Sequence, residues 1–155
     1  MNEKAIDVAL DLATKLCIHF EGFSAVPYLC PAGYWTIGYG TVFKPDGSRV
    51  TQTHPAITKE LALTWLESEI RNNYMVSILT ATPNLINYPQ TLGAMTDFAY
   101  NLGGPRYKAS TLARRIRDKN WQEAASQLLL WNKGGGRILP GLVKRRQAEA
   151  KFFPA

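Results

Sequence analysis

The pattern of apolar residues changes character twice along the chain, and these changes limit the folds that it can adopt. Residues 3–20 carry apolar side chains at helical spacing, and Gly22 lies just past the end of this pattern. Residues 23–50 form short runs of aromatic and β-branched residues, divided by prolines and glycines. After Pro55 the helical spacing returns and continues to the end of the chain. This order predicts an α+β fold whose small sheet is confined to one part of the molecule.

The middle segment predicts a small antiparallel sheet of two or three strands. Aromatic and β-branched residues favour strands because they pack well on a pleated surface. The strands are expected at about residues 26–30, 34–38 and 41–44, with a turn at Asp46-Gly47.

Helices are predicted after this sheet. Thr58 is a suitable N-cap for a helix that begins at Lys59 and continues to about residue 80. A helix of that length spans roughly 30 Å and is long enough to join two lobes. Further helices are expected over residues 90–102, 111–118, 121–133 and 142–153, with a break at the three glycines 134–136.

These elements predict a single domain with two lobes. A sheet lobe covers about residues 22–57, and the connecting helix covers about residues 59–80. A helical lobe covers about residues 84–155 and includes the N-terminal helix. The chain has 155 residues, of which 46% are hydrophobic, and this suffices to bury a core. A cleft between the two lobes is the expected place for an extended ligand.

The net charge of +6 favours polyanionic partners such as nucleic acid, anionic lipid or an acidic cell wall, and charge alone does not choose among them. The basic residues cluster only briefly, at residues 144–146, and no nucleic-acid-binding motif is present, so we expect no nucleic acid partner. No run of about 18 apolar residues and no secretory leader is found. We therefore expect no stable membrane insertion, and accumulation in the cytosol of the producing cell.

The cysteines and histidines do not form a ligand pattern. Cys17 and Cys30 are too few for a disulfide framework, and neither His19 nor His54 has a partner at a familiar metal-ligand spacing. We expect no metal and no cofactor.

Glu21 is the first candidate for chemistry. Cleavage of a glycosidic bond needs a proton donor at the leaving oxygen, and a carboxylic acid performs this task when its surroundings raise its pKa. Glu21 ends the N-terminal helix directly before the sheet. From this context alone, Glu21 could equally be one of the twelve acidic residues at the surface.

Cys30 and Thr36 are the candidates for the second catalytic group. A β-turn through residues 31–33 would bring them near each other across a hairpin, where a water molecule could lie between thiol and hydroxyl, opposite Glu21. The alternatives are a small buried hydrophobic residue for Cys30 and a strand-forming residue for Thr36.

The stretch FEGFSAVPYLCPAGYWTIGYGT at 20–41 resembles the active-site segment of the phage-type lysozymes, which are related to the T-even phage enzyme. That family has Glu, eight residues, Asp or Cys, five residues, Thr, and then Ile-Gly-x-Gly. Glu21, Cys30 and Thr36 match this pattern. The resemblance continues through TDFAYNLG at 96–103 and through residues 109–149, so it covers nearly the whole chain and implies a lysozyme-like fold.

The resemblance implies an endolysin that hydrolyses the β-1,4 bond between N-acetylmuramic acid and N-acetylglucosamine in peptidoglycan, with inversion at the anomeric carbon. Glu21 would protonate the glycosidic oxygen. Cys30 would stand where many members have an aspartate and would guide or activate the attacking water. Thr36 would hold that water by a hydrogen bond.

Four further residues are assigned to substrate binding by the same resemblance. Asn101 and Tyr100, in the YNLG segment, would contact the sugar from the helical lobe. Arg145 or Arg146 would approach the general acid, and the sequence does not decide between the two arginines.

The chain departs from the family pattern in ways that affect the expected chemistry or stability. An unperturbed thiol is only about 3% ionised at pH 7, whereas an aspartate is almost wholly ionised. If the base strength of Cys30 limits the rate, activity rises toward alkaline pH; if Cys30 only orients water, it does not. The family often has His where this chain has Thr41, so an ion pair built on that His is missing, and this departure affects stability rather than chemistry.

A regulatory disulfide is a further possibility that the resemblance raises. Some relatives control themselves by a disulfide to the catalytic cysteine, and Cys17 lies one helical turn before Glu21 on the same face. Two reduced, unconnected thiols at Cys17 and Cys30 remain the favoured interpretation.

Two other functions stay open. A lytic transglycosylase also uses one Glu without a second carboxylate and leaves a 1,6-anhydro sugar end. A basic cell-wall-binding module would need no catalysis. For the endolysin, the resemblance implies peptidoglycan as the partner and a phage holin for delivery from the host cytoplasm to the periplasmic wall. We expect a monomer.

Overall fold

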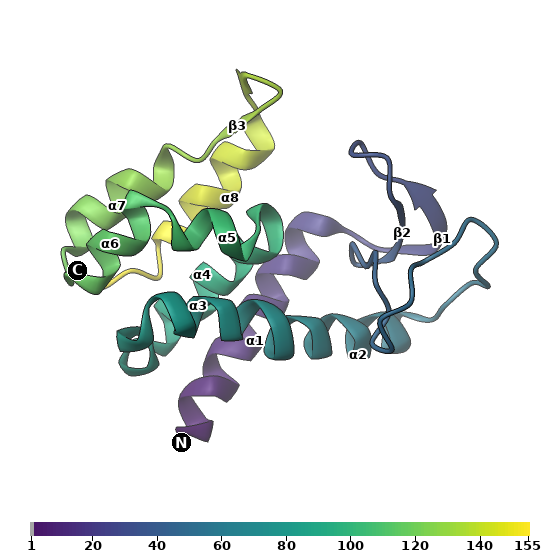
Figure 1. The fold of residues 1–155 in the computed structure, drawn as a ribbon, viewed down its shortest axis with the longest axis horizontal. Helices are drawn as coiled ribbons and strands as arrows, with labels where there is room; N and C mark the ends of the chain where they lie inside the picture. Colours follow the sequence, from purple (N-terminus) through teal and green to yellow (C-terminus); the bar gives the residue numbers. More distant parts are fainter. Residues whose placement is uncertain (1) are drawn as a thin grey trace.

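The computed structural model describes residues 2–155 and places a small sheet at one end of a mostly helical body (Figure 1). Helix α1 (Glu3–Glu21) begins where the Asn2 side chain accepts a hydrogen bond from the backbone N–H of Ala5. It ends where the N–H of Gly22, at a φ of 72°, donates to the carbonyl of Ile18. Glu21 is therefore the last residue of this helix, as predicted.

The sheet has two strands, a number that lies within the two or three predicted. Strands β1 (Ser24–Leu29) and β2 (Trp35–Gly38) pair in antiparallel fashion. The strand predicted at 41–44 is wrong, because this segment makes only isolated bridges, one of them between Ile37 and Thr41. Glycines at positive φ on both sides of Tyr39 turn the backbone back immediately after β2, so that this segment pairs with β2 only at the bridge between Ile37 and Thr41.

The connecting helix is not one regular helix from 59 to 80. It consists of α2 (Lys59–Glu69), a π-helical turn η1 (Ile70–Tyr74) and α3 (Met75–Ala81). Thr58 caps α2 as predicted, because its hydroxyl accepts a hydrogen bond from the N–H of Leu61. The π-helical turn adds backbone within the helix, and an apolar pattern does not reveal it.

The remaining elements form the helical lobe and its edge. The sequence did not predict α5 or the small hairpin of β3 and β4. This hairpin lies within the glycine break, where Gly135 and Gly136 have positive φ, and it shortens the helix expected to end at residue 133. The elements are η2 (Pro83–Asn87), α4 (Pro89–Leu102), α5 (Gly104–Lys108), α6 (Thr111–Arg117), α7 (Trp121–Leu129), β3 (Lys133–Gly134), β4 (Arg137–Ile138) and α8 (Pro140–Ala150).

Two hydrophobic clusters share helix α1. The larger cluster lies in the helical lobe and surrounds α4, with Phe98 fully buried at its centre. The smaller cluster joins Cys17 of α1 to Ile37 of β2 and Leu66 of α2. Because α1 contributes to both clusters, it carries its last residue to the boundary between the lobes, and Figure 1 shows it running from the helical body toward the strands. The predicted α+β architecture with a segregated sheet is confirmed.

None of the helices within residues 2–155 is both long and apolar enough to cross a membrane.

Candidate active site

Glu21 lies on a cavity of about 500 Å³ between the two lobes. Its side chain is 23% exposed, so the carboxyl is accessible without being surrounded by water. Tyr100 and Asn101 of α4 line the cavity from the helical lobe, and Tyr34 and Arg49 line it from the sheet lobe. The structure therefore brings three of the predicted site residues, Glu21, Tyr100 and Asn101, to one cavity.

Arg145 of α8 orients the Glu21 carboxyl. Its Nη1 donates to Glu21 Oε2 at 2.7 Å, although the two residues are 124 positions apart. Its Nε and Nη2 donate to the two carboxylate oxygens of Asp97 at 3.0 and 2.7 Å. The guanidinium also lies 5.3 Å from the ring centroid of Phe20. This bidentate pair to Asp97 fixes the plane of the guanidinium and thereby the direction of its third hydrogen bond.

Arg146 points in another direction. It is fully buried in the helical lobe, donates from Nη2 to Glu149 Oε2 at 2.9 Å and stacks 4.9 Å from the ring centroid of Phe98. Of the two arginines that the sequence left open, Arg145 is the one that approaches Glu21, and Arg146 does not line the cavity.

The Arg145–Asp97 pair is ionised although it is buried. Burial opposes the guanidinium charge, but the hydrogen bonds and charge of Asp97, with those of Glu21, raise the pKa of Arg145. Burial also opposes the charge of Asp97, but hydrogen bonds from Glu149 and Arg145 hold its pKa below the usual value. Sequence reasoning missed Asp97. Its only signal was a carboxyl group within a helix that is buried throughout residues 91–99.

Cys17 contacts the same carboxylate. Its Sγ lies 3.3 Å from Asp97 Oδ1, and burial raises its pKa well above the usual thiol value, so Cys17 stays a protonated donor. Cys17 and Cys30 are both free thiols in this structure.

Gly40 forms the floor beside Glu21. Its φ is 86°, and a Cβ atom there would lie 3.1 Å from Glu21 Oε1 and 3.2 Å from the hydroxyl of Tyr100. That hydroxyl is fixed, because it donates to the carbonyl of Tyr39 at 2.7 Å. Backbone conformation and space therefore both require glycine at this position.

Cys30 and Thr36 lie together on the hairpin. The backbone N–H of Cys30 donates to the carbonyl of Tyr34 at 3.0 Å, and the N–H of Gly33 donates to the carbonyl of Cys30 at 2.8 Å. In the register of the strands, Thr36 faces Tyr28 rather than Cys30. The pKa of Cys30 is nevertheless lowered by hydrogen bonds, first to the backbone of Tyr34 and also to the hydroxyl of Thr36.

Tyr28 connects this hairpin with Glu21. Burial raises the pKa of Tyr28, and the negative charges of Glu21 and Cys30 raise it further. Both charges therefore act on the same phenol, although neither Cys30 nor Thr36 lines the cavity that holds Glu21.

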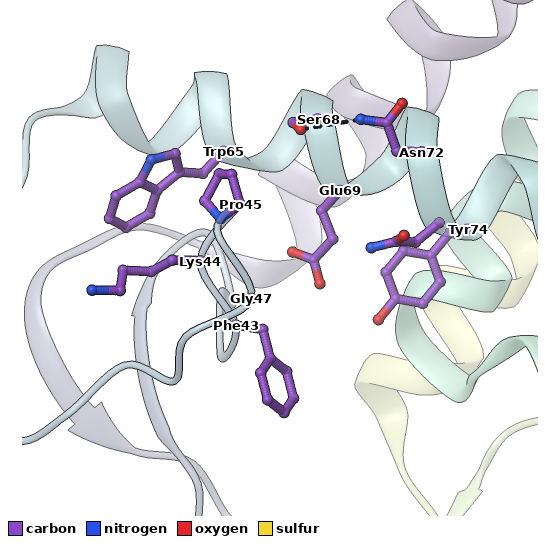
Figure 2. A pocket seen from close by; sticks show the side chains of 10 residues that line it. Phe43, Lys44, Pro45, Gly47, Trp65, Ser68, Glu69, Asn72 and Tyr74 are labelled. Atoms are coloured by element: carbon purple, nitrogen blue, oxygen red, sulfur yellow. Dashed lines mark hydrogen bonds between the residues drawn. The ribbon is translucent and has the colours of Figure 1, made fainter.

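A second cavity of about 420 Å³ adjoins the first, and Figure 2 shows its lining. The two cavities share Phe43, Glu69 and Tyr74. Burial raises the pKa of Glu69 to about 7, and among the described residues its Oε2 atom is buried without a hydrogen-bond partner. Sequence reasoning did not single out Glu69, because nothing in the pattern distinguishes it from a surface acid of the connecting helix.

The known proteins that this chain resembles are phage lysozymes and endolysins. A family model described as phage lysozyme matches residues 18–149. The chain is 35% identical over 144 residues to an endolysin of Bacillus phage B103, covering 86% of this chain and 49% of that protein, so it spans about half the length of that relative. It is 31% identical over 139 residues to an endolysin of Acyrthosiphon pisum secondary endosymbiont phage 1, covering 86% of this chain and 89% of that protein.

A solved structure is similar over nearly the whole fold. The endolysin from Escherichia coli O157:H7 phage FAHEc1 matches with a TM-score of 0.78 and 27% identity, over 91% of this chain and 89% of that chain.

Proposed function

Because the chain belongs to the phage lysozyme family, whose members are glycoside hydrolases, we propose that it is an endolysin that hydrolyses the β-1,4 bond between N-acetylmuramic acid and N-acetylglucosamine. The observation that carries this proposal is the Glu21 carboxyl, oriented by Arg145 at the boundary of the two lobes. A fixed carboxyl beside a cavity of this size suits a proton donor to a leaving sugar oxygen.

In the proposed reaction Glu21 protonates the glycosidic oxygen, and a water molecule attacks the anomeric carbon. Thr36 holds this water through its hydroxyl, and Cys30 orients it or, as a thiolate, accepts its proton. The hydrogen bonds that lower the pKa of Cys30 support the second role, because they increase the thiolate fraction near neutral pH. Attack from the face opposite the leaving group inverts the anomeric centre.

Tyr100 and Asn101 are proposed to contact the sugar. Both line the Glu21 cavity. The amide of Asn101 and the phenol of Tyr100 are polar groups of the kind that bind the hydroxyl and acetamido groups of a saccharide. The net charge of +6 also favours approach to an anionic cell wall.

Lysis of permeabilised Gram-negative cells tests this proposal. The wild-type protein is expected to clear the suspension, and the Glu21→Gln variant is expected to fail, because glutamine keeps the shape but cannot give a proton. Glu67→Gln is a matched control, since Glu67 is an exposed acid of α2. Clearing by Glu21→Gln at the wild-type rate would refute the assignment of the proton donor.

A lytic transglycosylase is the second candidate, favoured by the thiol at Cys30 in place of a second carboxylate. In that reaction a hydroxyl of the sugar itself replaces water. Mass spectrometry of the released fragments separates the two, because hydrolysis adds one water and transglycosylation leaves a 1,6-anhydro end.

We further propose that the protein accumulates in the host cytoplasm and reaches periplasmic peptidoglycan through a phage holin, and that it acts as a monomer.

A further inference from the structure

Glu69 stands where the two cavities meet, and the proposed catalytic role of Glu21 does not use it. Figure 2 shows its side chain extending from the connecting helix into the space between Tyr74 and the loop that carries Phe43. Since Glu69 lines both cavities, a ligand that passes from the Glu21 cavity into the second one must pass beside its carboxyl.

No cation of the described residues forms an ion pair with Glu69. Arg49 lines the first cavity, but its guanidinium lies over the rings of Tyr34 and Phe43, at 5.6 and 5.0 Å from their centroids. Lys44 lines the second cavity, and in Figure 2 its ammonium group points away from Glu69.

The chemistry of Glu69 therefore differs from that of an ordinary surface acid. Burial without a compensating charge raises its pKa to about 7, so the protonated form is well populated near neutral pH. A protonated carboxyl can donate a hydrogen bond to an amide carbonyl oxygen, which an ionised carboxylate cannot do. Because Oε2 is buried without a hydrogen-bond partner among the described residues, the carboxyl can meet a ligand in the cavity only through its other oxygen, Oε1.

The surroundings of Glu69 suit a sugar ring. Phe43 and Tyr74 supply aromatic surface beside the carboxyl, and Ser68 and Asn73 supply polar groups at the rim of a cavity of about 420 Å³. A lining that combines aromatic rings with several polar side chains suits a sugar, which presents both C–H and hydroxyl groups.

We propose that the second cavity is a subsite for an N-acetylated sugar of the glycan strand, and that the protonated carboxyl of Glu69 donates a hydrogen bond to the carbonyl oxygen of the acetamido group. The proposal rests on the proposed function, since it extends the same substrate away from Glu21. Glu69 is thus a specificity-determining residue, distant from the bond that is cleaved.

The pH dependence of binding separates Glu69 from its neighbours. The other titratable and charged groups that face it are Glu21 from α1, Lys44 and Arg49 from the loop, Tyr74 in η1 and Tyr100 of α4. All of them are identical in variants that differ only at residue 69, so a difference between such variants reports Glu69 itself.

The test uses the full chain with Glu21→Gln, which binds without cleaving, and soluble glycan strands freed of stem peptides by an amidase. Calorimetry at about pH 5.5 and about pH 8.5 is expected to show binding threefold to tenfold weaker at the higher pH, as for the loss of one hydrogen bond. Adding Glu69→Gln is expected to abolish this pH dependence, because glutamine donates and accepts at both values. Adding Glu69→Ala is expected to weaken binding at about pH 5.5 by a similar factor.

Glu67→Gln in the same background is the control and is expected to keep the full pH dependence, since Glu67 is exposed and lines neither cavity. Unchanged affinity in Glu69→Ala, or unchanged pH dependence in Glu69→Gln, would overturn the subsite, as would strands that bind at neither pH. These failures are distinct from failure of the proposed function, which is measured by lysis with the wild-type protein and Glu21→Gln.

Discussion

The two walls of the cleft hold their side chains by different means. On the helical wall, Glu21 is oriented by Arg145, which in turn is fixed by Asp97, and these three residues come from α1, α8 and α4. The hairpin wall reaches the cavity through Tyr34 and not through Cys30 or Thr36, and these two residues are held by hydrogen bonds within residues 30–36. The first arrangement is long-range and buried, and the second is local.

Because of this difference, the helical wall fixes the direction of the Glu21 carboxyl, whereas the hairpin keeps Cys30 near water. A buried ion pair holds a carboxyl in one direction, but either of its charges is strongly unfavourable when left alone. The side chains of Arg145 and Asp97 are 5% and 0% exposed. A turn held by its own backbone, such as that at Cys30, depends less on the rest of the fold and stays near solvent. We therefore expect substitutions far from Glu21 to disturb the proton donor. We expect substitutions at the same distance from the hairpin to leave the hairpin unchanged.

The largest effect is expected from Arg145→Met. This change leaves Asp97 buried without its cation, and such a loss costs about 3–5 kcal/mol. Urea unfolding measures it. Arg115→Met is the control, because Arg115 pairs with Asp118 at the surface and should lose only about 0–1 kcal/mol. Equal losses in the two variants would show that the buried pair does not hold the helical wall together.

Gly40→Ala is expected to disturb the helical wall directly. The positive φ costs about 1–2 kcal/mol, and the new Cβ presses on Glu21 and Tyr100, so activity should fall at least tenfold. Gly136→Ala has a similar positive φ and open space around the Cβ, so it isolates the backbone strain. If both variants keep wild-type activity in the lysis assay, the close approach of Gly40 has no role in positioning Glu21.

Glu69→Gln is expected to change stability modestly and in a pH-dependent way. The folded state binds its proton more tightly than the unfolded state, with a pKa of about 7 against 4.5, so the free energy of unfolding falls as pH rises through this window. Glutamine does not titrate. Relative to wild type, the variant should gain about 1 kcal/mol between about pH 4.5 and about pH 8.5, after allowance for partial exposure. A constant difference between the two proteins in urea unfolding would contradict the raised pKa.

The smallest effect is expected on the hairpin wall, from Cys30→Asp. If the thiolate accepts the proton of water, wild-type activity rises with pH through a pKa below the ordinary thiol value, whereas the aspartate variant is already ionised above about pH 5. The ratio of the two activities should then change several-fold between about pH 6 and about pH 8.5. Identical profiles would mean that Cys30 only orients water.

The difference between local contacts on the hairpin wall and long-range contacts on the helical wall also explains which features the sequence could predict. The hairpin and the end of α1 follow from local signals, namely the glycines, the prolines and the apolar spacing around Glu21. The choice of Arg145 over Arg146 depends on the rotation of α8 against α4, because adjacent residues of a helix point in different directions. That rotation is set by tertiary packing.

Three features could not be predicted from the sequence, because each depends on tertiary contacts or on backbone conformation and not on a local pattern. Asp97 is a carboxyl that finds its partner 48 residues away, so no local pattern marks it. The π-helical turn after Glu69 is a change in backbone hydrogen bonding that leaves the apolar spacing nearly intact. The strand expected at 41–44 was lost to glycine conformations that composition alone does not specify.

The role of Glu21 as proton donor is tested by the rate at which Glu21→Gln releases reducing ends from purified peptidoglycan, with unfolding curves to confirm that the variant is folded. We expect a rate at least about 100-fold below wild type, as for the loss of a general acid, while Glu67→Gln stays at the wild-type rate. A folded Glu21→Gln protein that cleaves within about threefold of wild type would contradict this role of Glu21.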